Sequence, residues 1–382
     1  MWVCLFTMNE QGTVSKPWLG GTMSVDSLKS SEEWFGKLDE FTSKLSIIGK
    51  REQCCSPTKI AILDTGVTEQ CYEILKDYIK EYKDFVSNND KLRQDRTEHG
   101  TTALRLLLKL YDDAEVYVGR IFEHKDADTE TERLMAEVSI QCHDTASALL
   151  LCVRLTTFLR QQAISHAKKQ WKVDIICLPS GFNPDQFAPP YRTQLYNAVT
   201  ATPDDKLRPR ALIFAAASNL GFASNVTYPG CLSQSSKVLC LFSTTGDGDP
   251  DRPGFNPAAV PNTYNLSLLG ESIRIDPQDK PIRGTSFSTI IAGAIAAHII
   301  DFSKHPDTKD KIRDVWFLQE VEGMTSVFAS MIVVKKNNYH VLEPWKLMKH
   351  YQTMALDREG LRQEICRNIS KALVDRNSRQ YL

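Results

Sequence analysis

The sequence predicts an α/β protein with a mostly parallel central sheet and helices on both of its faces. Residues 59–63 form a short apolar run rich in β-branched side chains, which is typical of a buried parallel strand. Two later stretches, 103–108 and 290–297, are apolar in the manner of buried helices. At 382 residues and 42% hydrophobic content, the chain is long enough to bury a large core.

The first two candidate functional residues along the chain are an acid, Asp64, and a base, His99. Asp64 directly follows the strand 59–63, so its carboxylate is held by the end of a buried strand. His99 lies where a loop gives way to the helical stretch 103–108, and we expect its ring to project from a fixed first turn. The two side chains are candidates for a hydrogen-bonded acid and base pair.

An amide and a hydroxyl follow later in the chain. Asn219 comes after the apolar run 211–217 and precedes a turn. Ser286 precedes the apolar stretch 290–297, and the N-terminus of that helix would add a positive dipole near its oxygen. Each residue alone has an ordinary structural explanation, such as a helix cap or a turn residue. The four together, in this order, point to nucleophilic catalysis.

The order of these motifs resembles that of the subtilisin-like serine peptidases, in which Asp, His and Ser follow one another along the chain. The strand-like segments 114–121, 173–178 and 211–217 also resemble strands of that family. The resemblance covers about residues 55–305 and implies a three-layer subtilisin-like fold. The motifs that carry it are Asp64-Thr65-Gly66, His99-Gly100-Thr101, Asn219 and Gly284-Thr285-Ser286.

The resemblance implies a role for each of these residues. Ser286 would attack the scissile carbonyl, His99 would take and return its proton, and Asp64 would orient the imidazole. Asn219 and the Ser286 backbone N–H would hold the oxyanion. The chain is therefore expected to be a serine endopeptidase that acts on protein or peptide substrates through an acyl-enzyme, with no metal or organic cofactor.

Substrate contacts are expected at Gly100, Ser180 and Gly181. Two neighbours depart from the family pattern. Glu98 stands where the family usually has glycine, and its carboxylate could crowd His99 or raise the pKa of that ring. Pro179 removes a backbone N–H from the segment that pairs with an extended substrate.

Two other functions stay open, the first of them because of these departures. One is a catalytically impaired, subtilase-like module that binds extended peptides or a partner domain. The other is an esterase or transacylase that uses the same triad.

Two extensions flank the predicted peptidase domain at 55–305. Residues 1–54 are expected to form a helical extension, which could be the remnant of a larger upstream helical region on which it packs. Residues 306–382 are expected to form a helical C-terminal extension that packs on the catalytic domain and resembles fungal intracellular relatives. Within 24–50 the apolar residues recur at helical spacing and form one stripe: Trp34, Phe35, Leu38, Phe41 and Leu45.

The segment 138–161 interrupts an expected charged helix. Val138-Ser139 can be encoded by GTAAGT, Leu155-Thr156 by CTAACN and Gln161 by CAG, which are splice signals in their proper order. One hypothesis is a retained intron, and the alternative is a genuine helical insertion. Sequencing the transcript separates the two.

Composition excludes some classes of partner. The chain has 46 Lys and Arg against 47 Asp and Glu, so its formal charge of −1 indicates neither nucleic acid nor an anionic membrane as a partner. Residues 1–10 lack a basic start and a long apolar stretch, so no signal peptide is predicted. Of the ten cysteines, Cys177 and Cys240 lie in apparent core strands, where buried thiols are expected. We expect an intracellular, reducing setting.

Overall fold

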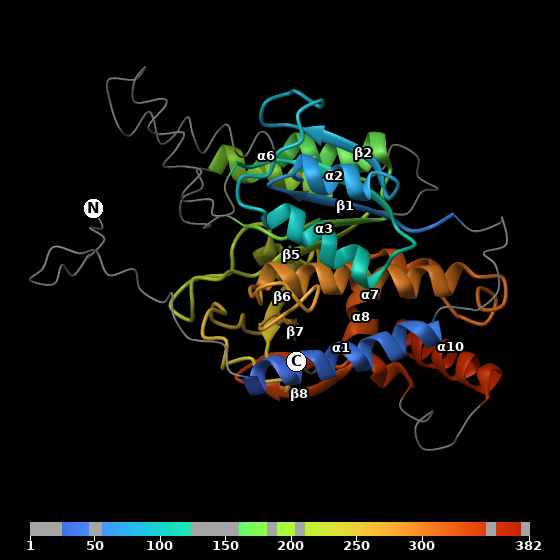
Figure 1. The fold of residues 1–382 in the computed structure, drawn as a ribbon. Coiled ribbons are helices and arrows are strands. Elements are labelled where there is room, and N and C mark those ends of the chain that lie inside the picture. The colour runs from blue at the N-terminus through green and yellow to red at the C-terminus, as the bar shows by residue number, and fades with distance from the viewer. Residues whose placement is uncertain are drawn as a thin grey trace, which may run out of the picture.

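A nine-stranded sheet forms the centre of the computed structural model, which describes residues 25–45, 56–123, 160–181, 189–202, 211–348 and 357–375. The strand order is β2-β3-β1-β4-β5-β6-β7-β9-β8 (Figure 1), and each neighbouring pair is parallel except β8 with β9. The strands are β1 (Lys59–Asp64), β2 (Ile79–Asp84), β3 (Glu115–Arg120), β4 (Ile175–Leu178), β5 (Leu212–Ala216), β6 (Leu239–Thr244), β7 (Asn265–Leu269), β8 (Ile332–Lys336) and β9 (Tyr339–Leu342).

Helices cover both faces of the sheet and make three layers. Successive side chains of a strand point to opposite faces, so Ile60 and Ile62 of β1 join one core while Ala61 and Leu63 join the other. Both faces are covered, which is why the strand is apolar throughout. Figure 1 shows α6 on one side of the sheet and α3 and α7 on the other. These helices are α3 (His99–Leu110), α6 (Pro189–Thr200) and α7 (Thr285–Lys304).

Helix α7 is the central helix of the larger core. By length and composition it could cross a membrane, but 89% of its most apolar window is buried inside the protein. Its small residues allow close packing on the sheet, because a Cβ added at Gly293 would lie 2.6 Å from Cys177 Sγ in β4. This close packing holds the first turn of α7, which carries Ser286, against the middle of the sheet.

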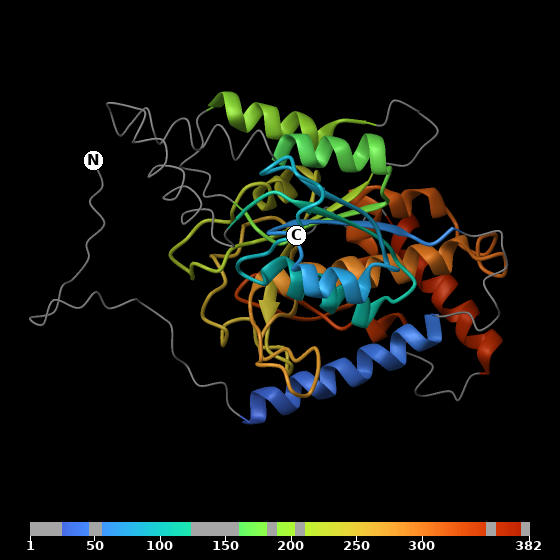
Figure 2. The ribbon, with the colours of Figure 1, turned by 45° about the horizontal axis from the view of Figure 1, so that its top comes forward.

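The predicted N-terminal amphipathic helix is present as α1 (Val25–Leu45), and all five residues of its apolar stripe are buried. The stripe packs on the same chain, against α7 and the short 3₁₀ helix η5 (Pro344–Met348). The Trp34 and Trp345 rings have centroids 5.6 Å apart in an edge-to-face arrangement. Ser27 Oγ lies 2.7 Å from Ser272 Oγ in a buried contact. Figure 2 shows α1 running along the outside of the body.

The C-terminal extension is only partly helical, which corrects the prediction for 306–382. Its residues 332–342 form an antiparallel hairpin, and β9 pairs in parallel with β7, so the extension completes the central sheet. Asn337 and Asn338 both have positive φ, 50° and 65°, as a two-residue hairpin turn requires. The helical elements here are η4 (Val315–Gln319), α8 (Val321–Ser330), η5 and α10 (Arg358–Val374).

Two other sequence predictions have different outcomes. Cys177 and Cys240 are buried free thiols, as expected, and burial raises the pKa of Cys177 to about 12. The segment 138–161, the subject of the intron hypothesis, lies outside the described residues except for 160 and 161, which are helical.

Candidate active site

The candidate catalytic residues meet at the carboxyl edge of the parallel strands. Asp64 is the last residue of β1, and His99 is the first residue of α3. Asn219 follows β5, and Ser286 is the second residue of α7. Loops and helix N-termini at this edge of an α/β sheet are a usual place for ligand sites.

Asp64 and His99 form a hydrogen-bonded pair. His99 Nδ1 lies 2.7 Å from Asp64 Oδ2, and the Asp64 side chain is only 1% exposed. The second carboxylate oxygen accepts the Thr65 N–H at 2.8 Å, so both oxygens are engaged. A proton on Nδ1 directed at Oδ2 leaves Nε2 as the acceptor nitrogen of the neutral ring.

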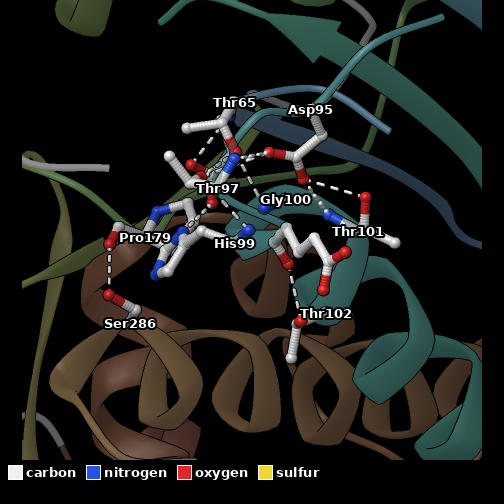
Figure 3. A network of polar contacts seen from close by, with 11 residues as sticks. Thr65, Asp95, Thr97, His99, Gly100, Thr101, Thr102, Pro179 and Ser286 are labelled. Atoms are coloured by element: carbon white, nitrogen blue, oxygen red, sulfur yellow. Dashed lines mark hydrogen bonds and ion pairs between the residues drawn. The ribbon is translucent and has the colours of Figure 1, made fainter. Parts of the chain in front are cut away.

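Ser286 lies at the N-terminus of α7, one residue before a side chain that contacts His99. Its hydroxyl donates to the Pro179 carbonyl at 2.6 Å (Figure 3). The ring of the next residue, Phe287, contacts the His99 ring with centroids 5.5 Å apart and planes tilted by 43°. The aromatic side chain thus covers the imidazole on the side of α7.

The side-chain carbonyl oxygen of Asn219 accepts two hydrogen bonds from Thr285, which leaves the amide nitrogen to act as a donor. Its Oδ1 accepts the Thr285 N–H at 2.9 Å and the Thr285 hydroxyl at 3.1 Å. A Cβ added at Gly284, where φ is +141°, would lie 3.2 Å from Asn219 Nδ2. Glycine therefore keeps open the space in front of this donor, and Asn219 itself is exposed.

The three expected substrate residues have different surroundings. Gly100 is buried inside α3, where an added Cβ would lie 2.4 Å from the Gly66 carbonyl oxygen, so packing explains this glycine. Ser180 and Gly181 are partly exposed after β4. An added Cβ at Gly181 would clash with Thr227 Oγ1 at 1.9 Å. The substrate roles of all three remain predictions.

Glu98 adopts the left-handed conformation, with φ 57° and ψ 12°. This left-handed conformation suits glycine better than a residue with a side chain. The Glu98 side chain is exposed, while its carbonyl accepts the Thr102 N–H at 2.9 Å and the Thr102 hydroxyl at 2.6 Å.

Sequence reasoning missed the residues that support His99. Asp95, Thr97 and Thr65 hydrogen-bond to the first turn of α3 (Figure 3). Asp and Thr just ahead of an apolar helix are a capping signal that could have identified the first two. In the described parts of the chain, no group of three or more His, Cys, Asp or Glu side chains is arranged to hold a metal ion.

Comparisons with known proteins identify the fold. No protein-family model matches the sequence, and a search of curated proteins gives no match. Among solved structures, a lanthipeptide protease has a TM-score of 0.54 at 12% identity, over 84% of this chain and 96% of its own. The nisin leader peptidase NisP of Lactococcus lactis has 0.51 at 12% identity, over 85% and 94%. The serine protease MycP1 of a type VII secretion system has 0.50 at 16%, over 84% and 86%. The chain therefore has the subtilisin-like fold.

Proposed function

We propose that this protein is a serine endopeptidase that cleaves peptide bonds through an acyl-enzyme. The observation that carries the proposal is the 2.7 Å contact between His99 Nδ1 and Asp64 Oδ2, with Ser286 at the start of α7 next to Phe287, whose ring contacts His99. Proteases among the matching structures have the same fold, and this supports the same reaction.

In the proposed reaction, Ser286 Oγ attacks the scissile carbonyl carbon while His99 Nε2 takes the hydroxyl proton. In the structure the Ser286 hydroxyl donates to the Pro179 carbonyl oxygen at 2.6 Å, and this hydrogen bond would break when the proton moves to His99. Asp64 stabilises the imidazolium that forms. The proton then passes from His99 to the leaving amine, and the acyl group stays on Ser286.

Asn219 Nδ2 and the Ser286 backbone N–H would donate to the oxyanion. Thr285 holds Asn219 Oδ1 from its backbone and its hydroxyl, so the amide is oriented before substrate arrives. Such preorganised donors act most strongly on the charge that develops in the transition state. A water molecule activated by His99 would then release the acyl group.

The second candidate is a peptide-binding module without catalysis. It is favoured by the Ser286 to Pro179 hydrogen bond, which engages the nucleophile, and by the missing N–H of Pro179 in the substrate segment. An esterase or transacylase would use the same groups and would turn over esters but not peptides.

A fluorophosphonate probe tests the proposal. We expect it to label the wild type on Ser286, as located by mass spectrometry, and not to label Ser286→Ala or His99→Ala. Ser303→Ala is the matched control, because Ser303 lies at the other end of α7 and donates to the Ile300 carbonyl. Folded wild-type protein that neither labels nor cleaves a peptide library, but still binds peptides, would establish the binding module instead.

We also propose an intracellular setting, supported by the free buried thiols of Cys177 and Cys240. Thiol alkylation of protein taken from its native source, followed by peptide mapping, tests this. Disulfide bonds at either cysteine would contradict it.

A further inference from the structure

The first turn of α3 is capped in an unusual way. The N-cap residue Glu98 makes no side-chain cap hydrogen bond in the described structure. The first three backbone N–H groups instead reach three other side chains (Figure 3). His99 donates to Thr97 Oγ1 at 3.3 Å, Gly100 to Thr65 Oγ1 at 2.9 Å, and Thr101 to an Asp95 oxygen at 2.8 Å. The turn that carries His99 is thus held from outside the helix.

Asp95 is the centre of this network. Its residue is 6% exposed. One carboxylate oxygen accepts both the N–H and the hydroxyl of Thr101 at 2.8 Å. The other oxygen lies 3.1 Å from Thr97 N and 3.2 Å from Thr97 Oγ1. One buried carboxylate therefore binds the chain two residues before His99 and two residues after it.

The network also reaches the strand end that carries Asp64. Thr97 Oγ1 lies 3.3 Å from Thr65 Oγ1, and Thr65 is the residue whose N–H binds the Asp64 carboxylate. On the other side, the Thr101 hydroxyl accepts the Thr68 N–H at 3.0 Å and donates to Asp95. Asp95 is thereby linked at two points to the chain that follows β1.

We propose that Asp95 is a positioning residue for the reaction, one that sets the place of the His99 ring relative to Asp64 and Ser286. This inference rests on the proposed function and deepens it. The hydrogen bonds of Asp95 go to Thr97 and Thr101, so it acts on His99 through the chain on both sides of that residue. A charged acceptor makes stronger hydrogen bonds than a neutral one, so the carboxylate holds this turn more firmly than an amide would.

Asp95→Asn tests the inference, because it keeps the size of the side chain but removes its charge and one acceptor. We expect kcat to fall by about 10- to 100-fold, with KM changed by less than about twofold, since a small misplacement of a catalytic group costs turnover rather than binding. The ¹H NMR signal of the proton between His99 Nδ1 and Asp64 should shift or broaden. This signal reports the geometry of the pair whether or not the protein turns over a peptide.

If Asp95→Asn does not fold, two less disruptive variants at Thr101 test the same inference. Thr101→Val removes the hydroxyl that joins Asp95 to Thr68, and we expect kcat to fall severalfold. Thr101→Ser restores a hydroxyl at the same place and should restore kcat.

Asp301→Asn is the matched control. Asp301 is also a carboxylate that accepts two hydroxyls, from Thr58 and Tyr111, but it lies near the far end of α7. It should lower Tm while leaving kcat and the His99 proton signal unchanged. If Asp95→Asn and Thr101→Val behave like this control, Asp95 is only a structural anchor and the inference is wrong. Absence of activity in the wild type contradicts the proposed function instead, and the NMR signal still decides the role of Asp95.

Discussion

At the residue scale, the candidate site depends on side chains whose direction is fixed by a partner. Asn219 shows this most clearly, because Thr285 occupies its carbonyl oxygen and so determines where its two amide protons point. Thr285 lies next to Ser286, so the Asn219 amide and the Ser286 hydroxyl are positioned by one segment. In the proposed reaction, the oxyanion donor and the nucleophile would therefore keep a common geometry.

Asn219→Ala should lower kcat by about 100- to 1,000-fold with little change in KM, because the donor acts mainly on the transition state. Steady-state kinetics with a peptide substrate measure this. Leu220→Ala is the control, since Leu220 is the next residue and is 64% exposed. Equal losses of kcat in the two variants would contradict the role of Asn219.

His340 predicts a pH dependence of stability. Its ring is buried in β9 and accepts the Asn265 N–H at 3.0 Å. Burial first, and then the charge of Lys335, lowers the pKa of His340 to about 4 from 6.5. The unfolded chain thus binds this proton more readily than the folded one. The contribution of His340 to the free energy of unfolding is therefore full above about pH 6.5 and is lost as the pH falls toward 4.

The loss from His340 amounts to at most about 3 kcal/mol in the free energy of unfolding. Urea unfolding between pH 4 and pH 7 measures it. His340→Asn keeps an acceptor for the Asn265 N–H but does not titrate there, so its stability should vary less over this range. An identical pH profile in the two proteins would rule out His340 as the cause.

At the element scale, the contact between α3 and the end of β1 requires glycine. A Cβ at Gly100 would lie 2.4 Å from the Gly66 carbonyl oxygen and 3.2 Å from Thr65 Oγ1. Helix α3 could accept a larger residue only by moving away from the strand end, and His99 would move with it. The distance between His99 and Asp64 thus depends on the absence of one methyl group.

Gly100→Ala should lower both Tm and kcat for this reason. Gly36→Ala is the matched control, because Gly36 lies within α1 and an added Cβ meets nothing within 4 Å. There the greater helix propensity of alanine should raise stability by about 0.5–1 kcal/mol. Thermal unfolding and peptide turnover of both variants test the contrast. A Gly100→Ala protein with wild-type kcat would show that α3 tolerates the shift.

The sequence predicted elements with a strong local pattern better than those fixed by tertiary contacts. The strand 59–63, the stripe of α1 and the helix after Ser286 all have clear periodicity or composition. The hairpin of β8 and β9 was missed because its strands are short and its Asn337-Asn338 turn was not recognised. Asp95 was missed because its importance comes from hydrogen bonds to residues on both sides of a histidine, which no periodicity reveals.

At the scale of the whole molecule, the flanking segments belong to the core of the fold. Trp34 is 5% exposed and packs on Trp345, while β9 extends the sheet beside β7. Helix α1 also contacts α7, the helix that carries Ser286. The described parts of the flanking segments therefore support α7, the helix that carries Ser286.

Trp34→Ala should lower the free energy of unfolding by about 3–5 kcal/mol, as is usual when a large buried aromatic is removed. Trp316→Ala is the control, because that tryptophan is 61% exposed and its loss should cost far less. Denaturant unfolding of both proteins gives the comparison. Similar small losses would mean that α1 is only loosely attached.

The pairing of β7 with β9 also has a consequence for how the chain folds during synthesis. All four candidate catalytic residues leave the ribosome before β9, yet the sheet gains its last parallel strand only when β9 has paired with β7. Contacts between residues so distant in sequence form slowly. We therefore expect the nascent chain to complete its central sheet only when β9 emerges, after the four candidate catalytic residues have been synthesised.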